Sequence, residues 1–272
     1  MPRIEVEPGV SLFVADLDPG PSRRGTVLLI HGWPASHRMW EFQLTDLPAR
    51  GLRCVALDLR GFGASDRPWQ CGYDVWADDV RRVVERMGLR DVTLAGFSMG
   101  GAIAMRYMAE HGASGAVSRL ALLAGAGPRM QHAPDNPAGL PREQYDGLIA
   151  GLRTDRPKTL AGFGQAFFGT PPSPELGAFM GSIAWGASPW ATIRGVEELR
   201  DADQRDALPA IRVPTLVCHG RRDAIVPFAM GEMQAKLIPG ARLVPFESSG
   251  HALFAEEAAK LNEELARFAT GG

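Results

Sequence analysis

Residues 92–110 read VTLAGFSMGGAIAMRYMAE, and this stretch decides the fold because it joins an expected strand to an expected helix through one serine. Its mainly apolar opening is typical of a buried strand, and the Ala- and Met-rich run 100–110 predicts a helix. Between them, Gly96 and Gly100 flank Ser98 in a G-x-S-x-G pattern, where glycines allow a tight turn without a Cβ clash. We interpret Ser98 as a nucleophile at a helix N-terminus, where amide dipoles favour developing negative charge. The alternative is a glycine-rich loop with an idle serine.

Further apolar runs alternate with helical patterns on both sides of this stretch. The expected strands are Ser11–Ala15, Val27–Ile30, Arg53–Leu57, Val92–Phe97, Leu120–Leu123, Thr215–Cys218 and Ala241–Phe246. The expected helices are Tyr73–Met87, Gly100–Glu110, Pro227–Leu237 and Leu253–Phe268. Several strands are apolar on successive residues, which is typical of strands buried on both faces. The pattern predicts an α/β fold with a mostly parallel central sheet flanked by helices.

The alternation stops after Gly127 and resumes after Asp203. The residues between them are rich in proline, glycine and aromatic side chains, and the segment is too long for a simple connection. We therefore expect residues 128–203 to be an inserted helical cap. Residues 1–127 and 204–272 are expected to form the core of a single domain.

Two further residues are needed beside Ser98, because a serine hydroxyl is a poor nucleophile without a base. His251 follows the last expected strand, in a loop at the carboxyl end where α/β sites are built, while His219 ends its own strand and is the competitor. Asp223 follows the strand TLVCHG and would hold the imidazole in its correct tautomer. Asp58 precedes the serine in the chain and is expected to be structural. The order Ser98, Asp223, His251 is the one expected for this architecture.

Ester chemistry also needs two preorganised donors for an oxyanion. One candidate is the backbone N–H of Met99, directly after the nucleophile. The other is the backbone N–H of Trp33 in the sequence HGWP at residues 31–34, because Pro34 has no N–H to offer. In the alternative interpretation HGWP is only a turn, and we expect His31 to be a structural hydrogen-bonding residue.

Aromatic and aliphatic residues near these positions are candidates for a substrate pocket. The candidates that flank the expected catalytic residues or come from the cap are Phe97, Trp185, Trp190, Val226 and Leu253. Other cap aromatics, Phe163, Phe167 and Phe168, could contribute to an apolar site for an acyl or aryl group. The alternative is that the cap aromatics form a small core of their own.

Composition excludes several classes of function. The chain has 272 residues with 29 Lys and Arg against 31 Asp and Glu, and a net charge of −2 gives no electrostatic footprint for nucleic acid. No stretch is long and apolar enough for membrane insertion, and the acidic N-terminus does not resemble a signal peptide, so a cytoplasmic location is expected. The three cysteines, Cys54, Cys71 and Cys218, form no metal or disulfide pattern. No metal, cofactor or nucleotide site is expected; the oligomeric state, including a homo-oligomer, stays open.

Five motifs together resemble the α/β-hydrolase superfamily. In chain order they are LLIHGWP, ALDLRGFGASDRPW, LAGFSMGGAIAMRY, LVCHGRRDAIVP and SSGHALF. The resemblance spans nearly the whole chain, and within the superfamily the sequence is most similar to cofactor-free, perhydrolase-type haloperoxidases and bacterial aryl esterases. It implies Ser98, Asp223 and His251 as a triad, with Trp33 and Met99 as oxyanion donors. Epoxide hydrolases and haloalkane dehalogenases also resemble the HGWP region, but they use an aspartate where this chain has Ser98.

These patterns predict a serine hydrolase that cleaves carboxylic esters of small, apolar or aryl molecules through an acyl-enzyme. Attack of hydrogen peroxide in place of water would give a perhydrolase side activity. A C–C bond hydrolase, a lactonase or a thioesterase on the same scaffold is the first alternative, because specificity depends on the cap. The second is a non-catalytic ligand-binding protein of the same fold.

Overall fold

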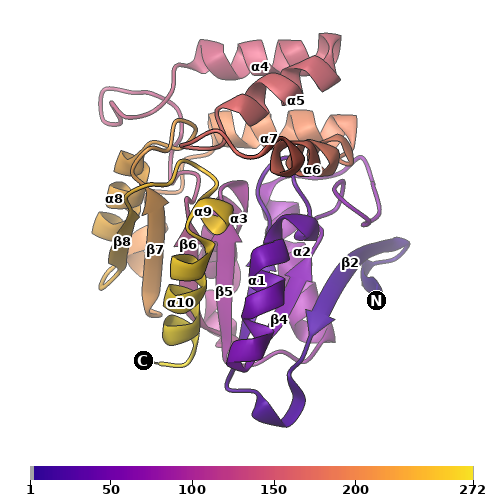
Figure 1. Cartoon of the computed structure of the whole chain (residues 1–272), viewed down its shortest axis with the longest axis vertical. Coiled ribbons are helices and arrows are strands. Elements are labelled where there is room, and N and C mark those ends of the chain that lie inside the picture. The colour runs from indigo at the N-terminus through magenta and orange to yellow at the C-terminus, as the bar shows by residue number, and fades with distance from the viewer. Residues whose placement is uncertain (1–2, 272) are drawn as a thin grey trace.

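A mostly parallel sheet runs through the centre of the molecule (Figure 1), whose computed structural model describes residues 3–271. Within that range the strands are β1 Arg3–Glu7, β2 Val10–Leu17, β3 Gly25–Ile30, β4 Leu52–Leu57, β5 Val92–Phe97, β6 Val117–Leu123, β7 Thr215–Gly220 and β8 Arg242–Phe246. They form one sheet in the order β1-β2-β4-β3-β5-β6-β7-β8. β1 and β2 are antiparallel to their neighbours, and every pairing from β4 to β8 is parallel.

Helices cover both faces of this sheet. Within residues 3–271 the α-helices are α1 Glu41–Asp46, α2 Tyr73–Arg86, α3 Met99–His111, α4 Arg142–Thr154, α5 Arg156–Gln165, α6 Pro174–Trp185, α7 Pro189–Asp201, α8 Phe228–Leu237, α9 Leu253–Glu256 and α10 Ala258–Ala269. Short 3₁₀ helices occupy Gly20–Ser22, His37–Trp40, Pro48–Arg50, Gly112–Ser114 and Leu208–Ala210. No helix in the described part of the chain is long and apolar enough to cross a membrane.

Each strand contributes side chains to two separate cores. Leu28 and Ile30 of β3 pack on the side of α2, α3 and α8, whereas Val27 and Leu29 pack on the side of α1, α9 and α10. All four side chains are fully buried. Alternate residues of a strand point to opposite faces, so burial of both faces explains why these strands are apolar at successive positions. The predicted α/β class with a covered, mostly parallel sheet is confirmed.

Two expectations about the elements were wrong. The predicted helix Leu253–Phe268 is broken into α9 and α10 at Glu257, whose φ of −125° and ψ of 45° are not helical. Apolar residues of both α9 and α10 pack into the same core, so the sequence pattern gives no sign of the break. The second error is an omission: no strand was expected at the edge strand β1, although its five residues RIEVE alternate between polar and apolar and Val6 is buried.

The helices α4 to α7 lie together above the sheet, over the ends from which β3, β4 and β5 lead into their loops (Figure 1). The indole N–H of Trp33, after β3, donates to the carbonyl oxygen of Thr192 in α7 at 2.8 Å. The backbone N–H of Ser188 donates to the carbonyl oxygen of Gly61, after β4, at 2.8 Å. The division of the chain into core and cap at residues 127/128 and 203/204 stays a prediction.

Candidate active site

Ser98 lies on a strained turn between β5 and α3. Its φ of 52° is in the left-handed region, which costs a non-glycine residue about 1–3 kcal/mol and is often found at functional sites. The two glycines of the motif are required by contact. A Cβ on Gly96 would lie 2.2 Å from the carbonyl oxygen of Gly100, and a Cβ on Gly100 would lie 2.4 Å from that of Ile30. The turn therefore packs directly against the neighbouring strand β3 and raises the serine above the sheet.

Three side chains from distant parts of the sequence form one line of hydrogen bonds. The Oγ of Ser98 is 2.9 Å from Nε2 of His251, and Nδ1 of His251 is 2.7 Å from Oδ2 of Asp223. A carboxylate can only accept, so Nδ1 carries a proton and Nε2 of the neutral ring accepts from the serine hydroxyl. Ser98 is 6% exposed and His251 is fully buried. The sequence-predicted nucleophile, base and carboxylate are thus brought together.

Asp223 is fixed by backbone and by two imidazoles. Its Oδ1 accepts the N–H groups of Ile225 at 2.9 Å and Val226 at 2.8 Å, which leaves Oδ2 for His251. Burial alone would raise the pKa of Asp223, but the imidazoles of His251 and His219 outweigh burial and hold the pKa well below its usual value. The carboxylate is therefore ionised throughout the neutral range.

The competitor His219 lies beside Asp223 and is bonded to the backbone. Its Nε2 is 2.8 Å from the carbonyl oxygen of Val226 and 3.5 Å from Oδ2 of Asp223. Its Nδ1 faces α8, where a Cβ on Gly231 would lie only 2.7 Å away. His219 thus packs against the carboxylate of Asp223. Among residues 3–271, the hydrogen-bond partner of Ser98 Oγ is His251.

The two predicted oxyanion donors flank the serine. A Cβ on Gly32 would lie 2.9 Å from Cβ of Ser98, so the chain after β3 passes directly beside the nucleophile and leads into Trp33. Met99 is the first residue of α3, where backbone N–H groups have no partner within the helix. Within residues 3–271, neither the Trp33 N–H nor the Met99 N–H donates to another protein group, so both are available to an oxyanion.

His31 and Asp58 hold the surrounding loops. Nδ1–H of His31 donates to the carbonyl oxygen of its neighbour at 2.8 Å, and Nε2 accepts the N–H of Leu59 at 3.0 Å. Burial lowers the pKa of His31, so the ring is neutral, as both bonds require. Asp58 accepts the backbone N–H and ring Nδ1–H of His37 at 2.6 and 2.9 Å and the N–H of Ala64 at 2.8 Å.

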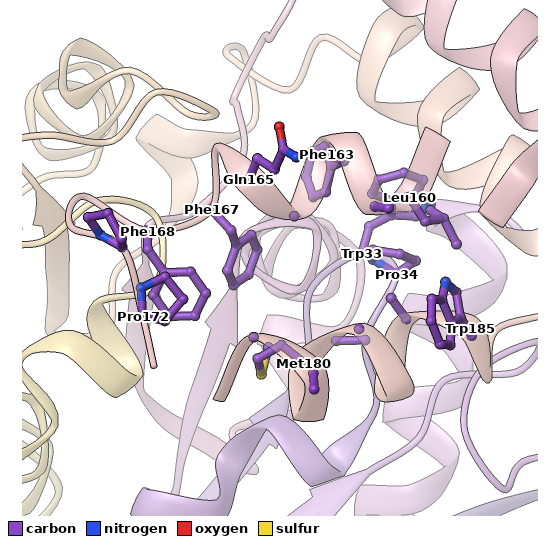
Figure 2. Close-up of a pocket in the computed structure, with 18 residues that line it drawn as sticks. Trp33, Pro34, Leu160, Phe163, Gln165, Phe167, Phe168, Pro172, Met180 and Trp185 are labelled. Atoms are coloured by element: carbon purple, nitrogen blue, oxygen red, sulfur yellow. The ribbon is translucent and has the colours of Figure 1, made fainter. Parts of the chain in front are cut away.

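A cavity of about 570 Å³ lies between α5 and α6, with Trp33, which follows β3, in its wall (Figure 2). Its lining residues are almost all apolar or glycine: Trp33, Pro34, Ala35, Leu160, Ala161, Phe163, Gly164, Gln165, Phe167, Phe168, Pro171, Pro172, Gly177, Ala178, Met180, Gly181, Ala184 and Trp185. None of these residues is charged. Trp33 and Phe167 connect the cavity to the catalytic line, because the ring of Phe167 lies 5.2 Å from that of His251.

Only one of the five residues predicted for the pocket lies in the wall of this cavity, namely Trp185. Phe97 is fully buried and does not line the cavity; its ring packs against those of Phe167, His251 and Phe254. Val226 and Leu253 are buried and do not line the cavity. Trp190 donates its indole N–H to the loop after β4. Adjacency in sequence to a catalytic residue therefore did not place a side chain in the cavity.

The sequence analysis missed a second set of lining residues, which includes Pro34, Leu160 and Met180. It also missed that Gly177 and Gly181 face the cavity four residues apart on α6. A signal was present, because residues at i and i+4 share one helix face and two glycines there leave a gap. The cap aromatics Phe163, Phe167 and Phe168 both line the cavity and pack on one another.

Known proteins are similar to this chain over nearly its whole length. The model of the family described as alpha/beta hydrolase fold matches residues 25–258. The AB hydrolase superfamily protein YisY of Bacillus subtilis is 44% identical, over 97% of each chain. The non-heme chloroperoxidase CPO-A1 of Kitasatospora aureofaciens is 34% identical, over 98% of this chain and 99% of its own. The solved structure of the esterase EaEST from Exiguobacterium antarcticum superposes with a TM-score of 0.94 at 37% identity, covering 98% of both chains.

Proposed function

The chain belongs to the alpha/beta hydrolase fold family, and within that family we propose that it is a serine esterase acting on carboxylic esters with apolar or aryl groups. The observation that carries the proposal is the line of hydrogen bonds from Ser98 through His251 to Asp223, at 2.9 and 2.7 Å. The similarity to an esterase of known structure supports it.

In the acylation step, Nε2 of His251 takes the proton of Ser98 Oγ while that oxygen attacks the ester carbonyl carbon. The N–H groups of Met99 and Trp33 receive the oxyanion, and Asp223 stabilises the imidazolium that forms. His251 then gives its proton to the leaving alcohol as the carbon–oxygen bond breaks. The product of this step is an acyl group on Ser98.

In the deacylation step, His251 takes a proton from water, which attacks the acyl carbon. The bond between that carbon and Ser98 Oγ breaks, and His251 returns the proton to the serine. The acid is released with every group in its starting state. All proton transfers pass through one imidazole, whose tautomer Asp223 maintains.

The cavity determines which esters we expect to react. Trp33 belongs both to the cavity wall and to the proposed oxyanion site, so a substrate carbonyl beside Ser98 would direct one substituent between α5 and α6. An apolar cavity of about 150 Å³ already binds benzene. The larger cavity here accommodates an aryl or extended alkyl group. The absence of charged lining residues within the described chain disfavours a carboxylate or phosphate there.

Replacement of Ser98 tests the proposal. In Ser98→Ala we expect kcat/KM for p-nitrophenyl butyrate to fall by about 10⁴-fold or more, because no other group replaces the nucleophile. Ser22→Ala is the matched control: Ser22 is an exposed serine in the 3₁₀ helix Gly20–Ser22 and should retain full activity. Substantial ester cleavage by purified Ser98→Ala would refute the covalent route.

The same protein samples decide between the alternatives. A panel of p-nitrophenyl esters, lactones, thioesters and C–C bond substrates should show the highest kcat/KM for esters. Covalent labelling by a fluorophosphonate probe separates an enzyme from a ligand-binding protein of the same fold. An unlabelled Ser98 in the folded wild-type protein would favour the binding protein.

We propose perhydrolysis as a side activity of the same acyl-enzyme, supported by the similarity to a non-heme chloroperoxidase. His251 would take a proton from hydrogen peroxide in place of water, and the peroxide oxygen would bond to the acyl carbon. The bond from that carbon to Ser98 Oγ breaks as His251 returns the proton to Oγ. The product is a peracid, which can oxidise halide in solution. Peracid formation from an acetate ester and hydrogen peroxide should disappear in Ser98→Ala. Its persistence would show that the two activities do not share the serine.

A further inference from the structure

The carboxylate of Glu256 joins two loops that are far apart in the sequence. Glu256 ends α9, five residues after His251. Its Oε1 accepts the N–H groups of Gly169 at 2.8 Å and Thr170 at 3.2 Å, and its Oε2 accepts the N–H of Gly250 at 2.8 Å. One side chain thus binds the segment between α5 and α6 and the residue directly before His251.

The same two loops also touch through their backbones. The N–H of Ala252 donates to the carbonyl oxygen of Phe167 at 2.9 Å. Gly169 and Gly250 approach so closely that a Cβ on Gly250 would lie 2.3 Å from the backbone nitrogen of Gly169. Both neighbours of His251 in the chain are therefore attached to residues 167–170.

This attachment reaches the catalytic line through Phe167. The ring of Phe167 lies edge-on to the imidazole of His251, with centroids 5.2 Å apart and planes at 84°. The same ring lines the cavity between α5 and α6. The segment that forms part of the cavity wall thus also contacts the imidazole and is bonded to both chain neighbours of His251.

The next residue offers a natural comparison. Glu257 accepts the backbone N–H of Ser248 at 3.2 Å and the hydroxyl of Ser249 at 2.6 Å. Both groups belong to the loop that carries His251, and among the described residues Glu257 accepts no hydrogen bond from 167–170. Among the described residues, only Glu256 joins the loop to that segment, whereas Glu257 lies 3.8 Å from Nζ of Lys260.

We propose that Glu256 is a positioning residue that couples residues 167–170, and with them Phe167, to His251. The proposal rests on the function proposed above for His251. The Glu256 carboxylate binds both loops through charge-assisted hydrogen bonds from three backbone N–H groups. A substrate in the cavity would therefore contact residues 167–170, the same segment that positions the imidazole of His251.

The first test is a double-mutant cycle in kcat/KM for p-nitrophenyl decanoate. Glu256→Ala and Phe167→Ala should each lower it, and the double variant should lose little more than the worse single variant, because both changes break one connection. Glu257→Ala and Phe167→Ala should instead have independent effects. Independent effects of the Glu256 and Phe167 substitutions would overturn the proposal. If Glu256→Ala does not fold, Glu256→Gln, which keeps shape and one acceptor, enters the same cycle.

The second test does not depend on ester cleavage. Amide hydrogen exchange of Gly169, Thr170 and Gly250 should accelerate together by about 10- to 100-fold in Glu256→Ala. In Glu257→Ala we expect acceleration around residues 248–250 without a change at 169–170. Acceleration confined to Gly250 in Glu256→Ala would overturn the coupling. If the loops loosen together but wild-type protein cleaves no ester, the proposed function fails while the connection stands.

Discussion

At the scale of single residues, the surroundings of Ser98 and Asp223 restrict each side chain to one hydrogen-bonding partner at the site. Ser98 occupies a backbone conformation in which its hydroxyl meets Nε2 of His251. Asp223 has one oxygen saturated by backbone N–H groups, so its other oxygen is left for the imidazole. The sequence predicted all three residues, because each follows a strand at its carboxyl end and each residue type suits one chemical role.

Asp223→Asn should lower kcat for p-nitrophenyl butyrate by about 10⁴-fold, because the amide favours the wrong tautomer of His251. KM should change little, since Asp223 lines no part of the cavity. Steady-state kinetics and a thermal melt on the same sample check both points. A variant that folds and keeps a kcat near that of the wild type would show that Asp223 does not serve His251.

Asp58→Asn should destabilise the fold in a manner that depends on pH. Burial would raise the pKa of Asp58, but hydrogen bonds from His37 and Ala64 favour the charged form and the pKa is lowered. A lowered pKa means that the ionised group stabilises the fold above its unfolded pKa of about 3.9 and that this contribution is lost as pH falls. The amide of asparagine would instead direct a donor at the Ala64 N–H.

We therefore expect Asp58→Asn to lower the free energy of unfolding by about 2–4 kcal/mol at pH 7. The difference from wild type should shrink below about pH 4, because the unfolded wild-type chain then binds a proton at Asp58 that the folded protein, with its lowered pKa, does not yet bind. Urea unfolding at pH 7 and pH 3 measures this, with the exposed Asp206→Asn as control. An equal difference at both pH values would contradict the assignment.

At the scale of the elements, two glycines of α6 keep the cavity open. A Cβ on Gly181 would meet no heavy atom within 4 Å, and one on Gly177 would meet only a proline ring carbon at 3.9 Å. Gly181→Leu should therefore fill the space without strain. We expect the ratio of kcat/KM for p-nitrophenyl decanoate over p-nitrophenyl acetate to fall by about 10-fold or more.

Gly162→Leu in α5 is the matched control for this prediction. Its Cβ would also meet nothing within 4 Å, but Gly162 is exposed and does not line the cavity. Both substitutions replace a helical glycine, so both should gain about the same helix propensity. The same loss of decanoate preference in both variants would show that the cavity does not hold the acyl chain.

Some features of the elements could be predicted from the sequence and others could not. The sequence predicted the buried strands from their continuous apolar runs, α2 from its apolar stripe, and α3 from its Ala- and Met-rich composition. It did not predict the break at Glu257. This residue has a non-helical backbone, and its carboxylate accepts a hydrogen bond from the loop that carries His251. Nor did it predict that the cavity lies between α5 and α6. The way in which two helices face each other depends on side-chain packing among α4 to α7.

At the scale of the whole molecule, residues 98, 223 and 251 meet because parallel strands end at one edge of the sheet. Chain order and the position of each residue after a strand, together with the resemblance to the α/β-hydrolase superfamily, predicted this meeting. The cavity wall is different, because it combines the loop after β3 with two helices that follow β6. That arrangement depends on contacts between segments more than 120 residues apart, for which one sequence carries no direct signal.

The central claim is that Ser98 carries the acyl group during turnover. The most direct measurement is peptide mass spectrometry of the protein quenched in acid during hydrolysis of a p-nitrophenyl ester. We expect one acyl group on the peptide that contains Ser98, absent from Ser98→Ala and strongly reduced in His251→Gln. Steady ester turnover by the wild type with the acyl group on another residue, or on none, would contradict the account.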